Sequence, residues 1–228
     1  MKKKAFILFL KYPEKGMVKT RIAKVLGNDF TLLLYKQFVA DILETSNKID
    51  ADTFIIYSTN DTAKGEDYFL GKGYSCLPQK GVNLGMRMYN AFHEIFSQGY
   101  MKLVLIGSDT PDLPPNYIDE AFLKLDEYDI VLGPSGDGGY YLMALQYDTL
   151  SYAIFDDIQW STSQVLRKTL KNMQRNGMTC YLLPELDDID DIDGLSHFYT
   201  RHKKRGETSH TMKFLFSNKE MLKRKICV

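Results

Sequence analysis

The sequence has 228 residues, enough for one sizeable domain with a short appendage at about 150 residues per domain. Hydrophobic residues account for 44% of them, and Lys plus Arg and Asp plus Glu number 29 each, so the formal net charge is +0. This composition indicates a globular protein and argues against nucleic acid as a partner. Three widely spaced cysteines offer neither a disulfide framework nor a CxxC metal site, which favours a cytoplasmic location.

The N-terminus predicts a buried strand rather than a targeting signal. Three lysines precede an apolar run over residues 5–10, but the run ends at Lys11 and no small-residue cleavage site follows it. No later apolar stretch approaches the roughly 18 residues that a membrane helix needs. We therefore expect a soluble protein with no transmembrane segment.

Short apolar runs bounded by charged residues, Gly or Pro are typical of buried strands. Such runs cover residues 5–10, 53–57, 103–106 and 130–132. Between them lie segments in which apolar residues have helical spacing. These segments cover residues 29–49, residues 83–96, a stretch that follows Pro114-Pro115, and residues 165–173. Strands that alternate with helices predict an α/β fold, in which a Rossmann-like, mainly parallel sheet is sandwiched by helices.

One stretch breaks this alternation and makes the predicted sheet mixed. Residues 133–139 are rich in Gly, and the segment that follows at residues 140–145 has the composition of a strand rather than of a helix. The pair Asp137-Gly138 within this stretch is a strong hairpin signal. We therefore expect a strand, a turn and a second strand here.

The neutral total hides two segments of opposite charge. Six of the nine residues from Glu185 to Asp193 are acidic, whereas nine Lys or Arg and only two Asp or Glu lie between Arg201 and Val228. We therefore predict a domain over residues 1–205 and a basic C-terminal tail over residues 206–228. The scattered basic residues favour a solvated, partly helical tail over an anchor to an anionic surface.

The loop after the first strand is a candidate binding site for a polyphosphate. It carries Lys11, Lys19 and Arg21, and ligands of open α/β sheets bind outside the carboxyl ends of strands. Met17 rather than Lys follows Gly16, so the GxxxxGK[ST] pattern of ATP-binding P-loops is absent. Arg21 could bind two phosphate oxygens at once. An exposed basic loop without a ligand is the alternative interpretation.

A second candidate site follows the strand at residues 103–106. Asp109 and Asp112 lie there in a loop that Pro111 and Pro114 stiffen. Carboxylates on a rigid loop suit Mg²⁺ or Mn²⁺ that is shared with substrate phosphates. Asp109 is nearer the strand end and is the stronger candidate, while Asp112 could instead cap the following helix.

The acidic segment supplies a second pair of carboxylates. Asp188 and Asp190 have a spacing that places both side chains on one side of an extended segment. Like charges at this density repel one another unless a cation offsets them. We therefore predict that Asp109, Asp188 and Asp190 converge on one divalent cation. The alternative interpretation is that these aspartates lie at the N-terminus of a helix, where the helix dipole favours negative charge. This interpretation suits Asp191 and Asp193 better.

The Gly-rich stretch has a structural and a functional interpretation. It could form only a tight turn, or its backbone could approach a sugar or phosphate closely, with Asp137 as a ligand. The sequence contains no GxSxG motif and no pair of histidines at metal-binding spacing. A hydrolase triad and a zinc site are therefore disfavoured.

Five motifs occur in order between roughly residues 4 and 200. They are Lys11-Tyr-Pro with Gly16-x-x-Lys19-Thr-Arg21, Gln79-x-Gly-x-Asn83-Leu-Gly85-x-Arg87, Gly107-Ser-Asp-Thr-Pro-Asp-Leu113, Gly133-Pro-x-x-Asp-Gly-Gly-Tyr-Tyr141, and Ile158-Gln-Trp160-Ser-Thr162 with Asp188-Ile-Asp190. In these motifs the chain resembles DUF2064, or selenodomain-associated transferase 1, a bacterial and archaeal family of glycosyltransferase-like proteins. Two departures stand out: Asn83 replaces an Asp that is usual in the family, and Gly194-Leu195 replaces Asp-Leu.

The resemblance implies the glycosyltransferase-A fold of the nucleotide-diphospho-sugar transferase superfamily, with Mg²⁺ or Mn²⁺ on the phosphates of a bound nucleotide. The implied nucleotide-binding residues are Lys11, Lys19, Arg21, Gln79, Asn83 and Arg87. The implied catalytic residues are Asp109 and Asp137, and the metal ligands are Asp109, Asp188 and Asp190. Gly138, Gly139, Tyr140 and Trp160 would form an acceptor or sugar pocket, with a place in the core as the alternative for Trp160.

The resemblance also implies a metal-dependent transferase that uses a nucleotide substrate. Transfer of a sugar from a nucleotide-diphospho-sugar to an unknown acceptor is the preferred interpretation. The main alternative is a nucleotidyltransferase that joins a nucleoside triphosphate to a small phosphorylated acceptor and releases pyrophosphate. The acceptor loop of such guanylyltransferases is not recognisable here, which favours glycosyl transfer. A non-enzymatic nucleotide-binding regulator is the third possibility.

Overall fold

A computed structural model describes residues 3–58, 73–206 and 208–225 of the protein. The strands in these residues are β1 (Lys4–Lys11), β2 (Asp52–Ser58), β3 (Ser75–Pro78), β4 (Lys102–Ile106), β5 (Ile130–Pro134), β6 (Tyr140–Gln146) and β7 (Cys180–Leu182). The helices are α1 (Thr20–Leu26), α2 (Asn28–Ser46), α4 (Leu84–Ser97), α5 (Pro115–Lys124), α6 (Val165–Arg175), α7 (Ile192–Arg205), α8 (His210–Ser217) and α9 (Lys219–Lys225), with the short 3₁₀ helices η1 (Tyr147–Thr149) and η2 (Tyr152–Phe155).

The described strands form one mixed sheet in the order β3-β2-β1-β4-β6-β5-β7. Strand β6 is antiparallel to both of its neighbours, and the remaining pairs are parallel. The Gly-rich stretch forms the turn between β5 and β6, as its sequence indicates. The predicted α/β fold with a mixed, mainly parallel sheet is therefore confirmed.

Three elements carry too little sequence signal to be predicted. The strands β3 and β7 lie at the two edges of the sheet and have only four and three residues. Their side chains are half-buried or exposed, so the continuous apolar run that marks the inner strands is missing. Helix α1 has seven residues, too few to display a clear helical period.

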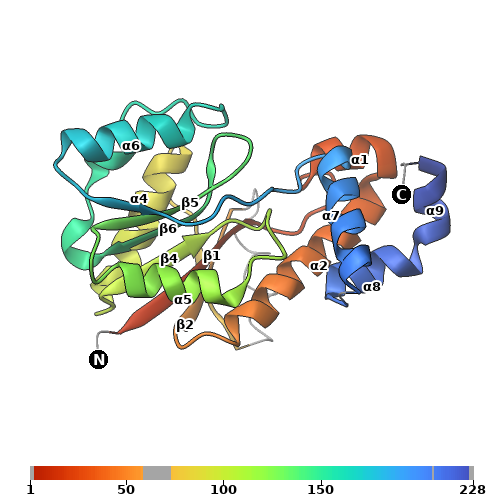
Figure 1. Ribbon diagram of the computed structural model, residues 1–228, viewed down its shortest axis with the longest axis horizontal. Coiled ribbons are helices and arrows are strands. Elements are labelled where there is room, and N and C mark those ends of the chain that lie inside the picture. Colours follow the sequence, from red (N-terminus) through yellow and green to blue (C-terminus); the bar gives the residue numbers. More distant parts are fainter. Residues whose placement is uncertain (1–2, 59–72, 207, 226–228) are drawn as a thin grey trace.

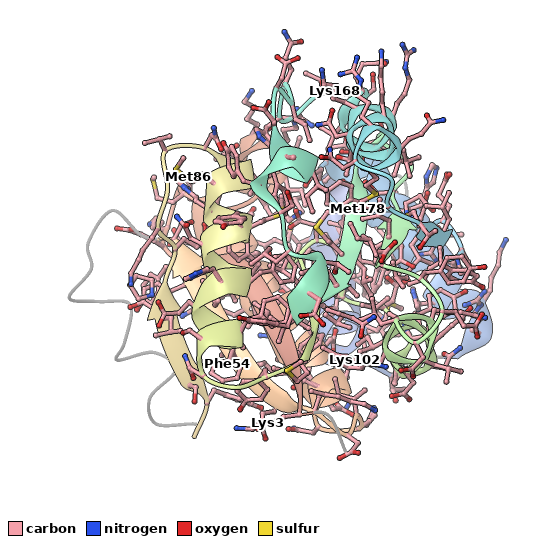
Figure 2. All side chains as sticks on the ribbon, turned by 90° about the vertical axis from the view of Figure 1, so that its left-hand side faces the viewer. Lys3, Phe54, Met86, Lys102, Lys168 and Met178 are labelled. Atoms are coloured by element: carbon pink, nitrogen blue, oxygen red, sulfur yellow. The ribbon has the colours of Figure 1, made fainter. Side chains whose placement is uncertain are left out.

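Helices cover both faces of the sheet (Figure 1). Successive residues of β1 point to opposite faces, so Leu8 and Leu10 pack in one core cluster and Ile7 and Phe9 in the other. The first cluster contains residues of α2, α5 and α7, and the second contains residues of α4 and α6. Figure 2 shows α4 in front of the sheet, with Met86 near the N-terminal end of that helix.

The order of the strands creates a switch point between β1 and β4. From β1 the chain passes to β2 and β3 on one side, and then returns to β4 on the other side of β1. Leu8 in β1 is paired with Ile106 in β4 in parallel register. The loops that follow these strands, at Lys11 and Gly107, therefore leave the same edge of the sheet side by side. Ligands of open α/β sheets bind at such a point.

The C-terminal helices α7, α8 and α9 lie at the same end of the molecule as α1 (Figure 1), where α7 contacts α1 and α8 contacts α2. Met212, Leu215 and Leu222 are buried in the same core cluster as one face of the sheet. The expected solvated tail is therefore wrong for these residues, although the tail is helical as expected. The division of the chain at residue 206 stays a prediction. Among the described helices, none has both the length and the apolar character needed to cross a bilayer.

Candidate active site

A cleft of about 500 Å³ lies at the carboxyl ends of β1 and β4, a volume that suits a small-molecule site. Most of the predicted site residues line it: Lys11, Lys19, Arg21, Gln79, Arg87, Asp109, Asp137, Gly139, Tyr140, Trp160, Asp188 and Asp190. Two predicted site residues are not part of this lining. Asn83 caps α4 by accepting from the N–H of Met86, and Gly138 packs against the backbone of Ser163.

Lys19 joins the two carboxylate-bearing segments of the cleft. Its Nζ lies 2.6 Å from Oδ1 of Asp109 and 2.8 Å from Oδ1 of Asp190, and its side chain is only 5% exposed. Burial lowers the pKa of Lys19, but the two carboxylates outweigh burial and raise the pKa, so the ammonium stays charged. Its backbone has a left-handed φ of 45°, which is strained for a residue other than Gly. The ammonium of Lys19 thus binds two carboxylates in this structure and is not exposed for binding a phosphate.

Main-chain hydrogen bonds bring the carboxylate segments together. The N–H of Ile189 donates to the carbonyl of Asp109 at 2.9 Å. Leu186 donates its N–H to the carbonyl of Pro134 and accepts from the N–H of Gly136, at 3.1 and 3.2 Å. The acidic segment consequently runs beside the end of β5 and reaches the loop that follows β4.

The two aspartates of the acidic segment differ in their electrostatic surroundings. Burial raises the pKa of Asp190, but the charges of Lys19 and Arg21 outweigh burial and lower it. Burial also raises the pKa of Asp188, to about 6, and the negative charges of Asp190 and Asp137 contribute to this rise. The neighbouring cations therefore outweigh burial at Asp190, whereas at Asp188 burial and the nearby carboxylates outweigh the charge of Lys19.

The predicted metal ligands fit a hard divalent cation by their chemistry. Asp109, Asp188 and Asp190 offer only carboxylate oxygens, which Mg²⁺ and Mn²⁺ prefer. The ammonium of Lys19 shows that two of these carboxylates can share one cation. The ligand atoms of all three aspartates do not lie within 4.8 Å of one another. A metal site at these residues therefore stays a prediction, with Asp109 and Asp190 as the pair that the fold brings together.

Tyr35 on α2 lines the cleft, although the sequence does not mark it as a site residue. Its hydroxyl lies 2.9 Å from the carbonyl oxygen of Lys11 and 2.9 Å from Oγ of Ser108, whose Oγ lies 3.3 Å from Oδ1 of Asp109. Burial raises the pKa of Tyr35, and the charge of Asp109 adds to the effect, so the phenol stays protonated. The phenol thus links the loops that follow β1 and β4. Helical spacing alone marks Tyr35 as a core residue, which is why its sequence position gives no sign of this role.

The segment between β3 and α4 is fixed by two of the predicted nucleotide-binding residues. Gln79 donates from Nε2 to the carbonyls of Leu10 and Ile56, at 3.1 and 3.2 Å. Arg87 donates from Nε to the carbonyl of Gly81 at 3.0 Å. Both amide hydrogens of Gln79 are therefore used, so its Oε1 is the atom left to accept a hydrogen bond from a ligand.

Asp137 stabilises the turn between β5 and β6. Its Oδ1 accepts hydrogen bonds from the hydroxyl of Ser135 and from the N–H of Gly139, the latter at 2.8 Å. This arrangement is the tight turn of the structural interpretation. The residue is also exposed and lines the cleft. Oδ2 makes no bond to the described residues, so the structure leaves one carboxylate oxygen for a ligand.

Tyr140 and Trp160 line the cleft with aromatic rings. Tyr140 packs beside the second core cluster and Tyr141 in the first, as the alternation of a strand requires. Trp160 is half-buried against Gly85, where a Cβ atom would lie 2.6 Å from the indole ring. Trp160 therefore both lines the cleft and packs against the core, so the pocket role and the core role that the sequence suggests apply together.

Asp112 has a structural role instead of a helix-capping role. Its Oδ2 lies 2.7 Å from Nη2 of Arg201 and 2.8 Å from Nε2 of His202, both on α7. Burial raises the pKa of Asp112, but the bond to His202 and the charge of Arg201 outweigh burial and lower it. The N-cap of α5 is Pro114, and no side chain caps that helix. The interpretation of Asp112 as its cap is therefore wrong.

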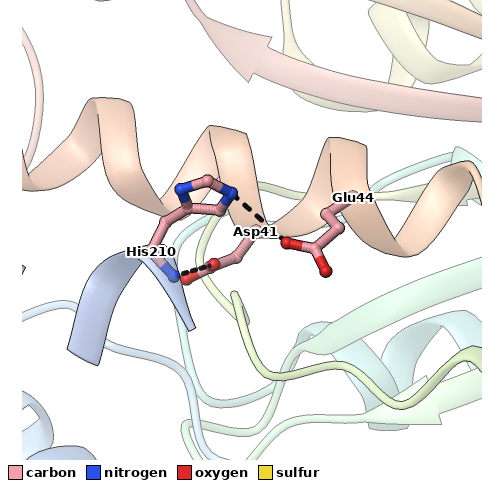
Figure 3. A group of neighbouring side chains, drawn as sticks. All are labelled: Asp41, Glu44 and His210. Atoms are coloured by element: carbon pink, nitrogen blue, oxygen red, sulfur yellow. Dashed lines mark hydrogen bonds and ion pairs between the residues drawn. The ribbon is translucent and has the colours of Figure 1, made fainter. Parts of the chain in front are cut away.

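A compact group of possible metal ligands lies outside the cleft, between α2 and α8 (Figure 3). Asp41, Glu44 and His210 have ligand atoms within 4.8 Å of one another, close enough to hold a metal ion. The carboxylate of Asp41 already accepts from the N–H groups of His210 and Thr211, at 2.6 and 2.9 Å. The ring of His210 pairs with Glu44 at 3.2 Å. A cap on α8 and an ion pair therefore account for this geometry.

Comparison with known proteins places these features in a family. Residues 42–162 match the family described as "Uncharacterized protein conserved in bacteria (DUF2064)". Among curated proteins, the chain is similar to 2-phospho-L-lactate guanylyltransferase of Methanocaldococcus vulcanius. The two are 23% identical over 203 residues, which cover 88% of this chain and 85% of the relative.

Solved structures share the fold. A candidate nucleotide-diphospho-sugar transferase from Desulfovibrio desulfuricans G20 has a TM-score of 0.93 and 35% identity, and the match covers 99% of each chain. The inositol-1-phosphate CTP transferase of T. maritima has a TM-score of 0.55 at 16% identity, over 94% of this chain and 96% of that one. A CMP:2-keto-3-deoxy-manno-octonic acid synthetase complexed with CTP has a TM-score of 0.57 at 8% identity, over 89% of this chain and 99% of that one. The last two matches show likeness of fold alone.

Proposed function

Because the chain belongs to the DUF2064 family, we propose that it is a metal-dependent nucleotidyltransferase. It would join a nucleoside triphosphate to a small phosphorylated acceptor and release pyrophosphate. The curated relative is named a guanylyltransferase, which supports a nucleotide as the substrate and guanine as the first base to test. Glycosyl transfer is the second candidate.

The observation that carries the proposal is the pairing of basic and acidic groups in one cleft. Lys11 at the end of β1 and Arg21 in the first turn of α1 line the cleft, close enough to lower the pKa of Asp190. Asp109 and Asp188 line the same cleft from the loop after β4 and the acidic segment. A triphosphate needs fixed cations for its outer phosphates and carboxylates for the metal ion that it carries. Both kinds of side chain line this cleft, which supports the proposal.

In the proposed reaction an oxygen of the acceptor phosphate attacks the α-phosphorus of the nucleotide. The bond from that phosphorus to the bridging oxygen breaks, and pyrophosphate leaves with the electron pair. Lys11 and Arg21 would hold the outer phosphates through charge-assisted hydrogen bonds. Their positive charge would stabilise the leaving pyrophosphate, which gains negative charge as the bond breaks.

The carboxylates and the segment after β3 would complete the site. Asp109, Asp188 and Asp190 would hold Mg²⁺ or Mn²⁺, which when bound neutralises phosphate charge beside the reacting phosphorus. Gln79 would accept a hydrogen bond from the nucleotide through Oε1, the atom that its own contacts leave open. The free Oδ2 of Asp137 would accept a hydrogen bond from a hydroxyl of the nucleotide or of the acceptor.

Two observations support glycosyl transfer. The rings of Tyr140 and Trp160 line the cleft, and an aromatic ring can pack against the apolar face of a sugar. The solved structure that is 35% identical is also named for sugar-nucleotide transfer. In that reaction a nucleoside diphosphate would leave instead of pyrophosphate, so the leaving group separates the two candidates.

The test is to identify that leaving group. The protein is incubated with Mg²⁺, GTP labelled at the α-phosphate, and a panel of small phosphorylated hydroxy acids that includes 2-phospho-L-lactate. We expect the label in a new nucleotide conjugate, with one pyrophosphate released for each transfer. Release of a nucleoside diphosphate from a sugar nucleotide, without pyrophosphate from any triphosphate, would instead establish glycosyl transfer.

A matched pair of variants shows whether the acidic segment carries the activity. Asp190→Asn should lower kcat by about tenfold to a thousandfold, the usual range for loss of one electrostatic contact. Asp193→Asn makes the same chemical change three residues later, at an exposed position in the first turn of α7. We expect Asp193→Asn to keep the wild-type rate.

A further inference from the structure

We infer that Lys19 and a divalent cation compete for the carboxylates of Asp109 and Asp190, so that the metal enters the cleft with the nucleotide and not before it. The order of entry rests on the proposed function, because it requires a nucleotide substrate. The competition itself concerns only residues of this chain.

The first support is the position of the ammonium. Nζ of Lys19 lies 2.6 Å from Asp109 and 2.8 Å from Asp190, between the two oxygens that a shared cation would use. Mg²⁺ binds carboxylate oxygens at about 2.0–2.1 Å, so an ion shared by these two oxygens would take the acceptors of the ammonium and would be repelled by its positive charge at close range. The ion and the ammonium therefore compete for this pair.

The second support is the burial of the ammonium. The side chain of Lys19 is 5% exposed, and Asp109 and Asp190 are its only hydrogen-bond and ion-pair partners among the described residues. A metal ion that arrived alone would leave a buried ammonium without a partner, and an unpaired buried charge is strongly destabilising. The free energy of losing the ion pairs of Lys19 with Asp109 and Asp190 therefore opposes metal binding when no nucleotide is present.

A nucleotide removes this obstacle. Its phosphates bring new negative charge into the cleft, which Lys11 at the end of β1 and Arg21 in the first turn of α1 line together with Lys19. The ammonium can then exchange its carboxylate partners for phosphate oxygens while the metal takes its former place. The left-handed backbone at Lys19 would be released in the same movement, because that strain persists only while surrounding contacts impose it.

The test compares Mn²⁺ binding to three nucleotide-free proteins by electron paramagnetic resonance. In Lys19→Gln we expect affinity for Mn²⁺ to rise about tenfold or more, since one nearby charge shifts the proton affinity of a carboxylate by a comparable factor. Lys15→Gln is the matched control, because Lys15 lies in the same loop but pairs with Asp29 at 2.6 Å, on exposed side chains. Lys15→Gln should bind Mn²⁺ as weakly as the wild type.

A measurement on the wild type alone keeps the inference testable if Lys19→Gln does not fold. Mn²⁺ should raise the Tm of the wild type when GTP is present, and should have little effect alone at the same concentration. Mn²⁺ that raises the Tm of the nucleotide-free wild type as much as it does with GTP, or that binds the wild type as tightly as it binds Lys19→Gln, would overturn the competition, whatever reaction the protein performs. Competition without binding of any nucleoside triphosphate would overturn the order of entry and the proposed function, but not the competition.

Discussion

The N–H of Ile189 donates to the carbonyl of Asp109 at 2.9 Å, and this bond joins two acidic segments that are far apart in the sequence. Because Ile189 is itself buried, its side chain anchors the acidic segment in the core. Asp190 is thereby held at the distance from Asp109 that one ammonium spans. The site thus depends on a main-chain contact as much as on its charged side chains.

Arg21 is the residue for which we expect the largest effect on nucleotide affinity. Arg21→Ala should weaken binding by about 1.5 to 3 kcal/mol, the range for hydrogen bonds to charged groups. Isothermal titration with GTP and Mg²⁺ measures this change. Lys24→Ala, which removes an exposed charge from the last turn of the same helix, serves as the control. Equal affinities for the two variants would remove Arg21 from the binding site.

Asp137→Asn separates the two roles of that residue. An Asn side chain keeps an oxygen for the N–H of Gly139 and the hydroxyl of Ser135, so the turn and the Tm should be preserved. The loss of charge should lower kcat by about tenfold to a thousandfold. Wild-type turnover at wild-type stability would limit Asp137 to the turn.

Tyr35→Phe should show that the phenol positions Asp109. The change removes a buried hydroxyl between Lys11 and Ser108, which should lower the free energy of unfolding by about 1 to 3 kcal/mol and also lower kcat. Tyr100→Phe is the control, because it removes a hydroxyl bond to Asp52 that lies outside the cleft. If both variants lose stability but keep the same kcat, Tyr35 has only a structural role.

Asp112 should make stability depend on pH in the acidic range. Its pKa is lowered in the folded protein, so its contribution is present above the unfolded pKa of about 3.9 and is lost as pH falls through the folded value. Urea unfolding should show Asp112→Asn about 1.5 to 3 kcal/mol less stable than wild type at pH 7. The difference should shrink below about pH 4. A difference that stays constant down to the acid unfolding of both proteins would contradict the role of its charge.

Metal chelation distinguishes the two explanations of the group between α2 and α8. If Asp41 is a helix cap, Asp41→Ala should lower stability by about 0.5 to 2 kcal/mol, and EDTA should not change the Tm of the wild type. Asp41→Asn keeps an acceptor oxygen and should recover part of the loss. A fall in the Tm of the wild type with EDTA that is absent in Asp41→Ala would instead assign a metal ion to this group.

The inner strands could be predicted because both of their faces are buried. In β4 all five residues are buried, and the sequence shows this directly as an apolar run. The edge strands β3 and β7 lack such a run because each has only one neighbouring strand and a partly exposed face. Their existence depends on pairing with β2 and β5, which a local pattern does not encode.

The residue types of the site could be predicted, but not the contacts between them. The sequence shows a basic loop and an acidic segment without indicating whether they bind a ligand or each other. Lys19 does the latter in this structure. Asp112 resembles a helix cap in sequence because it lies just before α5. Its actual partners, Arg201 and His202, lie on α7, about ninety residues later in the chain. Such long-range pairs are set by the packing of α7.

Trp160 is the only tryptophan of the chain, and its half-buried indole lies in the cleft wall against Gly85. Its fluorescence therefore reports on the cleft without interference from any other indole. A nucleotide that enters the cleft should change the intensity or the emission wavelength of this single fluorophore. The protein thus carries an intrinsic optical probe, with which ligands can be screened in solution without a label.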